Sequence, residues 1–138
     1  MRVVFRSKAT KGMIGTYAVA SELSRQGWIV VPTYGNAPGV DLLASRLDRT
    51  VGIQVKTARV PSAGWLLESS KISDKIFYIF VSTGKKTRFW ILRGSEVGAH
   101  CYKQSINRVK FRLEKTEQPR FENQWSVLND FEGSVAVL

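Results

Sequence analysis

The sequence predicts an α/β fold in which helices flank a central mixed β-sheet. Residues 11–27 place apolar side chains at helical spacing, which indicates an amphipathic helix. Residues 40–57 hold two apolar runs about a polar turn, and residues 76–92 hold two more, so each stretch predicts a pair of strands. Because no linker or repeat interrupts its 138 residues, the chain is expected to form a single domain over residues 1–138.

The first half of the chain has clear element boundaries. The helix is expected to end at Gly27, a residue type that favours helix termination. A short buried strand is expected at residues 28–32, and the turn-forming residues 34–39 predict a loop. Residues 34–38 directly precede Asp41, so they either line a substrate cleft or serve only as a connection. The hairpin of residues 40–57 follows, with its turn expected at Asp48-Arg49.

The second half is expected to hold a sheet region and a helical end. Residues 61–75 are Ser-rich and are expected to be irregular. The remaining expected elements are, in order, a strand at 76–81, a basic turn at 84–86, a returning strand at 88–92, a helix capped by Ser95, a strand at 109–113 and a closing helix over 121–129.

The chain carries a strong excess of positive charge, with 21 Lys and Arg against 11 Asp and Glu and a formal net charge of +10. This balance indicates a polyanionic partner such as nucleic acid, and a basic surface without such a partner is the alternative. No window holds the roughly 20 apolar residues that span a bilayer, so no membrane partner is expected. Residues 1–8 lack a signal-peptide pattern and Cys101 is the single cysteine, so a cytoplasmic location is expected.

The hairpin of residues 40–57 carries the candidate chemistry. Antiparallel pairing sets Asp41 beside residues 54–56, and strand alternation puts Gln54 and Lys56 on one face while Val55 points into the core. A carboxylate, an amide oxygen and an ammonium then meet next to the Val55 carbonyl. Oxygen ligands of this kind suit Mg²⁺ or Mn²⁺, and Lys56 can orient water or neutralise charge on a phosphate.

The alternative is an ordinary hairpin whose polar residues face solvent. Asp41 lies among apolar neighbours, and Gln54 and Lys56 interrupt a second apolar run. Polar side chains buried without partners are costly, so their presence in such apolar strands favours a functional role.

The same residues resemble a nuclease superfamily. The run that ends at Asp41, followed thirteen positions later by the start of Gln54-Val55-Lys56, resembles the PD-(D/E)XK nucleases in their Q-x-K form. Good matching covers about residues 11–57. The resemblance implies a restriction-endonuclease-like α/β sandwich and a metal-dependent endonuclease acting on DNA, with RNA as the alternative substrate. It places Asp41 and Gln54 at the metal and makes Lys56 the catalytic lysine, and it implies a possible homodimer.

The first helix departs from that superfamily. Lys11-Gly12 at its start and Gly27-Trp28 at its end resemble archaeal-type Holliday-junction resolvases and small bacterial relatives. Such nucleases usually carry a glutamate four residues after the Lys-Gly pair, where this chain has Thr16. Glu22 lies six residues further on, about 240° around the helix axis, and cannot replace it. Asp41 is therefore the one carboxylate expected in the site, which predicts weak metal binding until a phosphate completes the coordination.

A set of basic residues is expected to hold nucleic-acid phosphates without reading sequence. Its members are Lys8, Lys11, Arg46, Arg49, Arg59, Lys71, Lys85 and Lys86.

Other reactive or aromatic side chains are expected to be structural. His100 is the single histidine, which excludes a His-based metal cluster or triad within one chain. Cys101 is expected to pack within a helix, and Trp65, Trp90 and Trp125 are expected in the core.

Two further functions compete with the endonuclease. The missing carboxylates at Thr16 and Gln54 favour a nucleic-acid-binding module that keeps the fold and lacks catalysis. The basic surface also suits an interaction subunit, such as a toxin- or antitoxin-like component, with an acidic partner.

Overall fold

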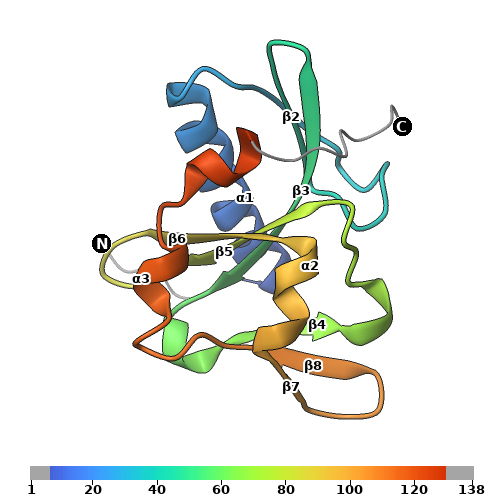
Figure 1. Cartoon of the computed structure of the whole chain (residues 1–138), viewed down its shortest axis with the longest axis vertical. Coiled ribbons are helices and arrows are strands. Elements are labelled where there is room, and N and C mark those ends of the chain that lie inside the picture. The colour runs from blue at the N-terminus through green and yellow to red at the C-terminus, as the bar shows by residue number, and fades with distance from the viewer. Residues whose placement is uncertain (1–6, 130–138) are drawn as a thin grey trace.

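A computed structural model of the chain describes residues 7–129 (Figure 1). Residues 1–6, on which the expected absence of a signal peptide largely rests, lie outside the described residues. The helix α1 (Lys8–Arg25) begins after the N-cap Ser7, whose hydroxyl accepts a hydrogen bond from the Thr10 N–H. It therefore starts three residues earlier than the expected residue 11. Within residues 7–129, no helix is both long and apolar enough to cross a bilayer.

The main sheet is mixed, as expected. Its strands are β1 (Ile29–Pro32), β2 (Leu42–Arg46), β3 (Arg49–Ala58), β5 (Phe77–Ser82) and β6 (Arg88–Arg93), in the order β1-β2-β3-β5-β6. β3 and β5 pair in parallel, and the other neighbours pair antiparallel. All six residues of β5 are buried, which agrees with its continuous apolar sequence.

A second sheet of three strands lies beside the main sheet. It consists of β4 (Trp65–Glu68), β7 (Cys101–Lys103) and β8 (Arg108–Phe111), in the order β4-β8-β7 (Figure 1). The short helices α2 (Gly94–Val97) and α3 (Gln118–Phe121) and the 3₁₀ turn η4 (Trp125–Asn129) complete the described chain. We call β4, β7 and β8 the small sheet.

The core divides into two clusters on opposite faces of the main sheet. One face packs α1 through Val19 and Leu23 against β2, β3 and β5. The other packs the small sheet, with Trp65 and Phe111 against Phe80 of β5. The indole N–H of Trp65 donates to the Val81 carbonyl at 3.1 Å, which ties the small sheet to the main one.

Several sequence expectations about the elements are wrong. The irregular stretch 61–75 contains β4, whose four residues alternate buried and exposed over too short a length to give a periodic signal. β1 was expected to be buried, but it is an edge strand whose Ile29 and Val31 are 71% and 54% exposed. The hairpin turn is Leu47-Asp48, because Arg46 pairs with Arg49 and Leu47 adopts a φ of 56°.

The C-terminal expectations also change. Cys101 begins strand β7 rather than lying in a helix. The helix near Ser95 begins at Gly94, with Arg93 at the N-cap. The closing helix over 121–129 is broken, because α3 ends at Phe121 and Asn123 takes a φ of 57° before η4. Trp65 and Trp90 are buried as expected, and Trp125 packs half-buried on Phe89.

Candidate functional site

The backbone of Asp41 is fixed where the chain enters β2. Its N–H donates to the Ile53 carbonyl at 2.8 Å, which continues the β2–β3 ladder by one residue. Its carbonyl accepts from the Thr33 N–H at 3.0 Å, so β1 holds it from the other side. Asp41 therefore stands between two strands at one end of the hairpin, opposite the Leu47-Asp48 turn.

The pairing expected from the sequence is confirmed. The Asp41 Oδ2 accepts the Val55 N–H at 2.9 Å, while the Val55 side chain is buried in the α1 cluster. Gln54 and Lys56 share the opposite face of β3 and line one cavity with Asp41. A ligand role for the Val55 carbonyl stays a prediction, since the observed contact with Asp41 uses its N–H.

A cavity of about 260 Å³ contains these three side chains, and we call it the Asp41 cavity. The loop between β1 and β2 lines it through Gly35, Ala37 and Pro38, as expected for that loop. The small sheet, its connection to β5 and β5 itself also line the cavity, through Leu67, Glu68, Lys71, Ile72 and Tyr78.

Glu68 is a carboxylate that the sequence did not reveal. It ends β4, lines the Asp41 cavity and is half exposed, with Lys71 Nζ 3.2 Å from its Oε2. The sequence did offer one sign of this strand. Trp65 and Leu67 are apolar and two positions apart, so in a strand they would share one face and Glu68 would lie on the other. The cavity therefore offers two carboxylates and one amide, from three different strand segments.

The cavity penalises charge on both of its central ionisable groups. Burial raises the pKa of the Asp41 carboxyl, although the Val55 N–H and the charge of Lys56 act in the opposite direction. Burial likewise lowers the pKa of the Lys56 ammonium, against the attraction of Asp41 and Glu68. Both shifts move the pKa values of the two groups toward neutral pH. This pattern is expected of groups that exchange protons or hold a cation.

Thr16 does not supply a ligand to this cavity. Its hydroxyl donates to the Gly12 carbonyl one turn back at 3.1 Å, and its side chain is buried in the helix interface. The preceding residue explains how closely α1 approaches β3. A Cβ on Gly15 would lie 1.9 Å from the Thr57 Oγ1, so only glycine fits there.

The structure separates the expected phosphate-binding residues into groups. Lys71 lines the Asp41 cavity, and Lys8 lines a neighbouring cavity together with Lys56. Lys11, Arg59, Lys85 and Lys86 are exposed, and their contact with nucleic acid stays a prediction.

Arg46 and Arg49 lie at the turn end of the hairpin, away from Asp41. The Arg46 guanidinium donates to the Gln26 carbonyl and the Asn129 side chain and lies 4.5 Å from the Trp28 ring centroid. Arg49 donates to the Leu128 carbonyl at 3.3 Å. These contacts give both arginines a packing role, and a nucleic-acid role for them also stays a prediction.

The neighbouring cavity, of about 410 Å³, brings in two cations that the sequence analysis missed. Arg108 and Lys110 of β8 line it together with Lys8 and Lys56, and we call it the Lys110 cavity. It shares Lys56, Leu67 and Glu68 with the Asp41 cavity, so the two adjoin.

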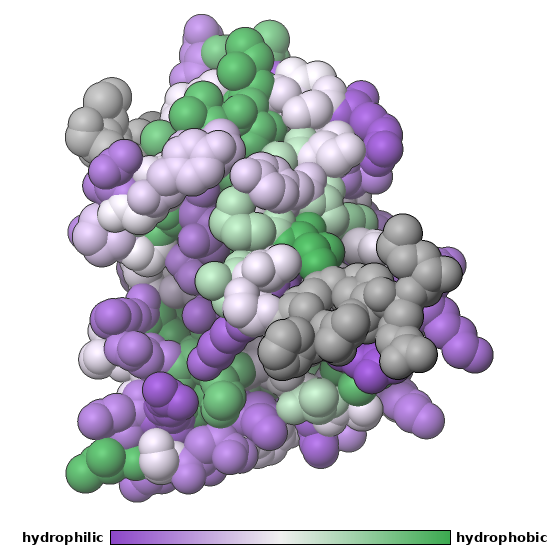
Figure 2. Space-filling view, turned by 180° about the vertical axis from the view of Figure 1, so that it is seen from behind, coloured by the Kyte–Doolittle hydropathy of each residue, from purple (hydrophilic) through white to green (hydrophobic). Residues whose placement is uncertain are grey.

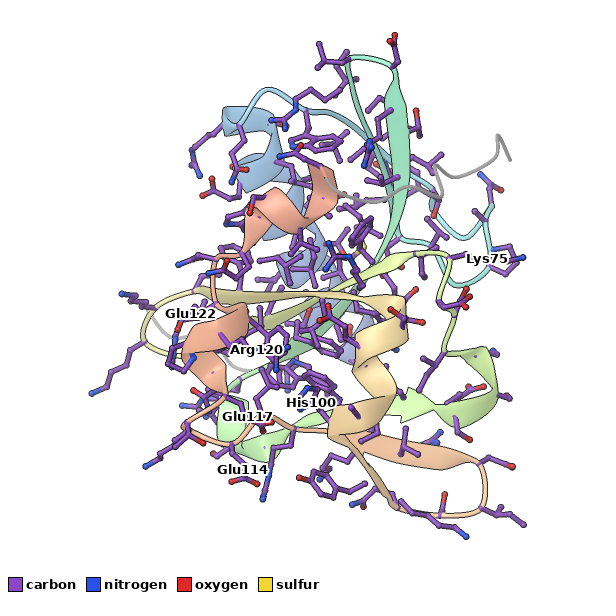
Figure 3. All side chains as sticks on the ribbon, in the orientation of Figure 1. Lys75, His100, Glu114, Glu117, Arg120 and Glu122 are labelled. Atoms are coloured by element: carbon purple, nitrogen blue, oxygen red, sulfur yellow. The ribbon has the colours of Figure 1, made fainter. Side chains whose placement is uncertain are left out.

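Figure 3 shows His100 near α2 and α3, and Cys101 follows it at the start of β7. His100 Nδ1 is 3.1 Å from Glu117 Oε2, and its ring packs edge-on against Phe111 and Phe121. The Cys101 thiol donates to the Val97 carbonyl, and burial raises the pKa of that thiol. His100 packs between α3 and the small sheet, and Cys101 packs near α2, so both have the expected structural role.

The donor set of the Asp41 cavity fits a hard divalent cation that keeps part of its water shell. Asp41, Gln54 and Glu68 offer only oxygen ligands, the kind that Mg²⁺ and Mn²⁺ prefer. Among residues 7–129, no three His, Cys, Asp or Glu side chains gather as a metal-binding group. The described protein ligands therefore leave coordination positions for water and phosphate oxygens.

The fold is shared with two DNA-acting proteins of known structure. A bacterial homing endonuclease, I-Ssp6803I, aligns with a TM-score of 0.64 and 16% identity, over 89% of this chain and 91% of that one. Hjc of Archaeoglobus fulgidus, a Holliday junction resolvase, aligns with a TM-score of 0.60 and 13% identity, over 88% and 98% of the two chains. No protein-family model and no curated protein matches the sequence. The chain thus has the restriction-endonuclease-like fold expected from its hairpin.

Proposed function

We propose that this protein is a Mg²⁺- or Mn²⁺-dependent endonuclease that hydrolyses phosphodiester bonds of DNA. One observation carries the proposal: Asp41, Gln54 and Lys56 line one cavity of a restriction-endonuclease-like fold. The net charge of +10 supports a polyanionic substrate. Branched or otherwise structured DNA is the substrate form that the likeness to a Holliday junction resolvase favours.

The residues divide the chemistry between them. Asp41 and Gln54, with the Val55 carbonyl and Glu68, would hold the cation. When bound, the cation supplies charge neutralisation at the scissile phosphate and lowers the pKa of water. Lys56 orients the attacking water and neutralises charge that develops on the phosphate. Its lowered pKa also lets a fraction of its amine accept the water proton.

Cleavage assays test this function directly. Wild type and the variants Asp41→Ala and Lys56→Ala are incubated with plasmid and branched DNA in Mg²⁺, in Mn²⁺ and in EDTA. We expect metal-dependent cleavage by wild type and a loss of at least about 100-fold in both variants, the size typical of a removed proton-transfer or charge-stabilising group. Asp48→Ala removes a carboxylate from the exposed turn at the other end of the hairpin and should cleave like wild type. An inactive wild type that still binds DNA would exclude the enzyme.

A catalytically silent nucleic-acid-binding module is the second candidate. Thr16, which commits its hydroxyl to its own helix, favours it because the helix then adds no ligand to the site. Salt-sensitive binding that is equal in wild type and both variants, without cleavage in either metal, would establish this function instead.

The remaining expectations stay predictions: a single domain over residues 1–138, a cytoplasmic location and a possible homodimer. A two-fold dimer would suit duplex DNA, because its two sites would face the two strands symmetrically.

A further inference from the structure

Strand β8 and the residues after it alternate strictly between basic and apolar side chains. Val109, Phe111 and Leu113 face the core, where Phe111 and Leu113 are 0% and 4% exposed. The alternate positions, Arg108, Lys110 and Arg112, therefore point to the outer face of the small sheet. We call these three residues the β8 stripe.

The neighbours of the β8 stripe give the outer face an amphipathic character. By strand register, Lys110 lies between Leu66 of β4 and Tyr102 of β7, which are 46% and 50% exposed. The Arg112 guanidinium lies 6.0 Å from the Tyr102 ring centroid. Figure 2 shows hydrophilic surface over the end of the molecule that carries the small sheet, while hydrophobic surface gathers at the opposite end, near the β2–β3 turn.

The stripe leads into the candidate active site through the Lys110 cavity. Arg108 and Lys110 line that cavity together with Lys8 and Lys56. Positive side chains thus continue from the outer face of the small sheet to the lysine assigned to catalysis.

Negative charge along this path is sparse and already paired. Of the described residues that line the Lys110 cavity, four are cationic and Glu68 is the one carboxylate. Glu68 pairs with Lys71 at 3.2 Å, outside that cavity. At the far end of the stripe, Glu114 pairs with Arg112 at 3.3 Å and partly neutralises it. Within residues 7–129, Arg108, Lys110 and Lys8 form no ion pair, although Glu68 lies opposite Arg108 in the β4–β8 register, so positive charge concentrates at these three residues.

We propose that the β8 stripe and the Lys110 cavity bind the sugar–phosphate backbone of one nucleic-acid strand and lead it to Asp41 and Lys56. Alternate side chains of a strand stand roughly 6.8 Å apart, twice the rise per residue, which is comparable to the separation of successive phosphates along one strand. Cations in such a row contact phosphates without reading bases, and the exposed Tyr102 ring offers a surface for base stacking. This inference rests on the proposed function. It places the path of the substrate strand on the small sheet, which contains none of the residues of the nuclease motif.

Binding measurements in EDTA test the path without any cleavage. The affinity of the full chain for a fluorescent single-stranded oligonucleotide of mixed sequence is measured by anisotropy over a series of salt concentrations. For the double variant Arg108→Gln/Lys110→Gln, we expect the slope of log K against log salt to fall by about 1.4, or about 0.7 for each lost phosphate contact. At low salt we expect the affinity to fall at least about tenfold. Lys110→Arg keeps the charge and should bind like wild type.

A charge-matched control separates local contact from the overall field. Arg25→Gln/Lys75→Gln removes two exposed cations that line neither cavity, and it should lower affinity much less. Urea unfolding confirms that each variant is folded. Equal losses in the control and the β8 variant, or no loss in the β8 variant, would overturn the path while leaving the cleavage result intact. Conversely, a wild type that binds through β8 but never cleaves would support the path and remove the hydrolytic function.

Discussion

At the scale of single residues, burying Asp41 and Lys56 in the site lowers the stability of the folded protein. Burial in the cavity disfavours the charged forms of both Asp41 and Lys56, because it raises the pKa of the carboxyl and lowers the pKa of the ammonium. The hydrogen bond from Val55 and the mutual attraction of the two charges compensate only in part. Such a cost persists in proteins where the charged group performs a function.

Because the pKa of Asp41 is raised, we expect Asp41→Asn to increase the free energy of unfolding by an amount that depends on pH. A folded-state pKa above the unfolded value contributes stability below the unfolded pKa, and this contribution is lost as pH rises through the folded pKa. The free energy of unfolding of Asp41→Asn, relative to wild type, should therefore increase as pH rises through that window. The gain should stay below about 1 kcal/mol because the carboxylate is partly screened. Urea unfolding from pH 3.5 to 7 measures it, with Asp48→Asn as control; a relative gain that shrinks with rising pH would contradict it.

Gly15 sets the distance between α1 and β3 next to Lys56. A Cβ at this position would meet the Thr57 side chain, so Gly15→Ala should lower the free energy of unfolding by about 1–3 kcal/mol through overpacking. Thr57→Ala removes the obstructing hydroxyl and should recover part of that loss in the double variant. Gly12→Ala lies in the same helix with no atom near its Cβ, and it should stabilise the protein by about 0.5–1 kcal/mol. Additive effects of Gly15→Ala and Thr57→Ala in chemical denaturation would refute this contact.

At the scale of elements, the sequence predicts those strands and helices that are long enough to show a periodic pattern of apolar residues. The hairpin and the β5–β6 pair were predictable because their apolar runs are long and bounded by turn residues. In the small sheet, β8 was expected as a strand at 109–113 and lies at Arg108–Phe111. β4 and β7 were not predicted, because they have only four and three residues, and β4 pairs with β8 across a long stretch of chain. Glu68 and Lys110 therefore entered the site only through tertiary structure.

The C-terminal segment contacts β6 through an ion pair as well as through backbone and apolar contacts. Arg88 donates from Nε and Nη2 to the two carboxylate oxygens of Glu122, both at 2.9 Å, and Trp90 bridges to Glu122 through the backbone. The hydrogen bonds from Arg88 hold the pKa of the Glu122 carboxyl below its ordinary value. This bidentate contact is the main polar link between α3 and the main sheet.

That lowered pKa predicts a loss of stability in acid. A depressed folded-state pKa contributes stability above the unfolded pKa, and this contribution is lost as pH falls through the folded pKa. Glu122→Gln should therefore be less stable than wild type at pH 7, by on the order of 1 kcal/mol for a partly exposed pair, and the difference should shrink as pH falls below the ordinary glutamate pKa of about 4.3. Thermal unfolding across this range measures the difference. If it is the same at pH 7 and pH 3, the ion pair does not stabilise the segment.

At the scale of the whole molecule, three of the site's features come from separate parts of the chain. The hairpin provides Asp41, Gln54 and Lys56, and sequence spacing alone was sufficient to place them together. The small sheet provides Glu68 and the basic wall, which no local pattern indicates. The helix α1 provides Lys8 but no carboxylate. The two carboxylates of the site, Asp41 and Glu68, therefore come together only through the packing of the two sheets, and the metal affinity of the site should depend on that packing.

With two half-buried or exposed carboxylates and open coordination positions, the Asp41 cavity should bind Mn²⁺ weakly alone and more tightly with DNA. Phosphate oxygens would complete the coordination, so DNA should raise the Mn²⁺ affinity several-fold, and Mn²⁺ should raise the DNA affinity by the same factor. Titrations of the Lys56→Met variant, followed by electron paramagnetic resonance with and without DNA, avoid cleavage. Glu68→Gln in this background should weaken Mn²⁺ binding, whereas Glu114→Gln, similarly exposed and paired with Arg112, should not. Equal Mn²⁺ affinity in the two glutamate variants would show that Glu68 serves only its pair with Lys71, and an affinity unchanged by DNA would show that no phosphate reaches the cavity.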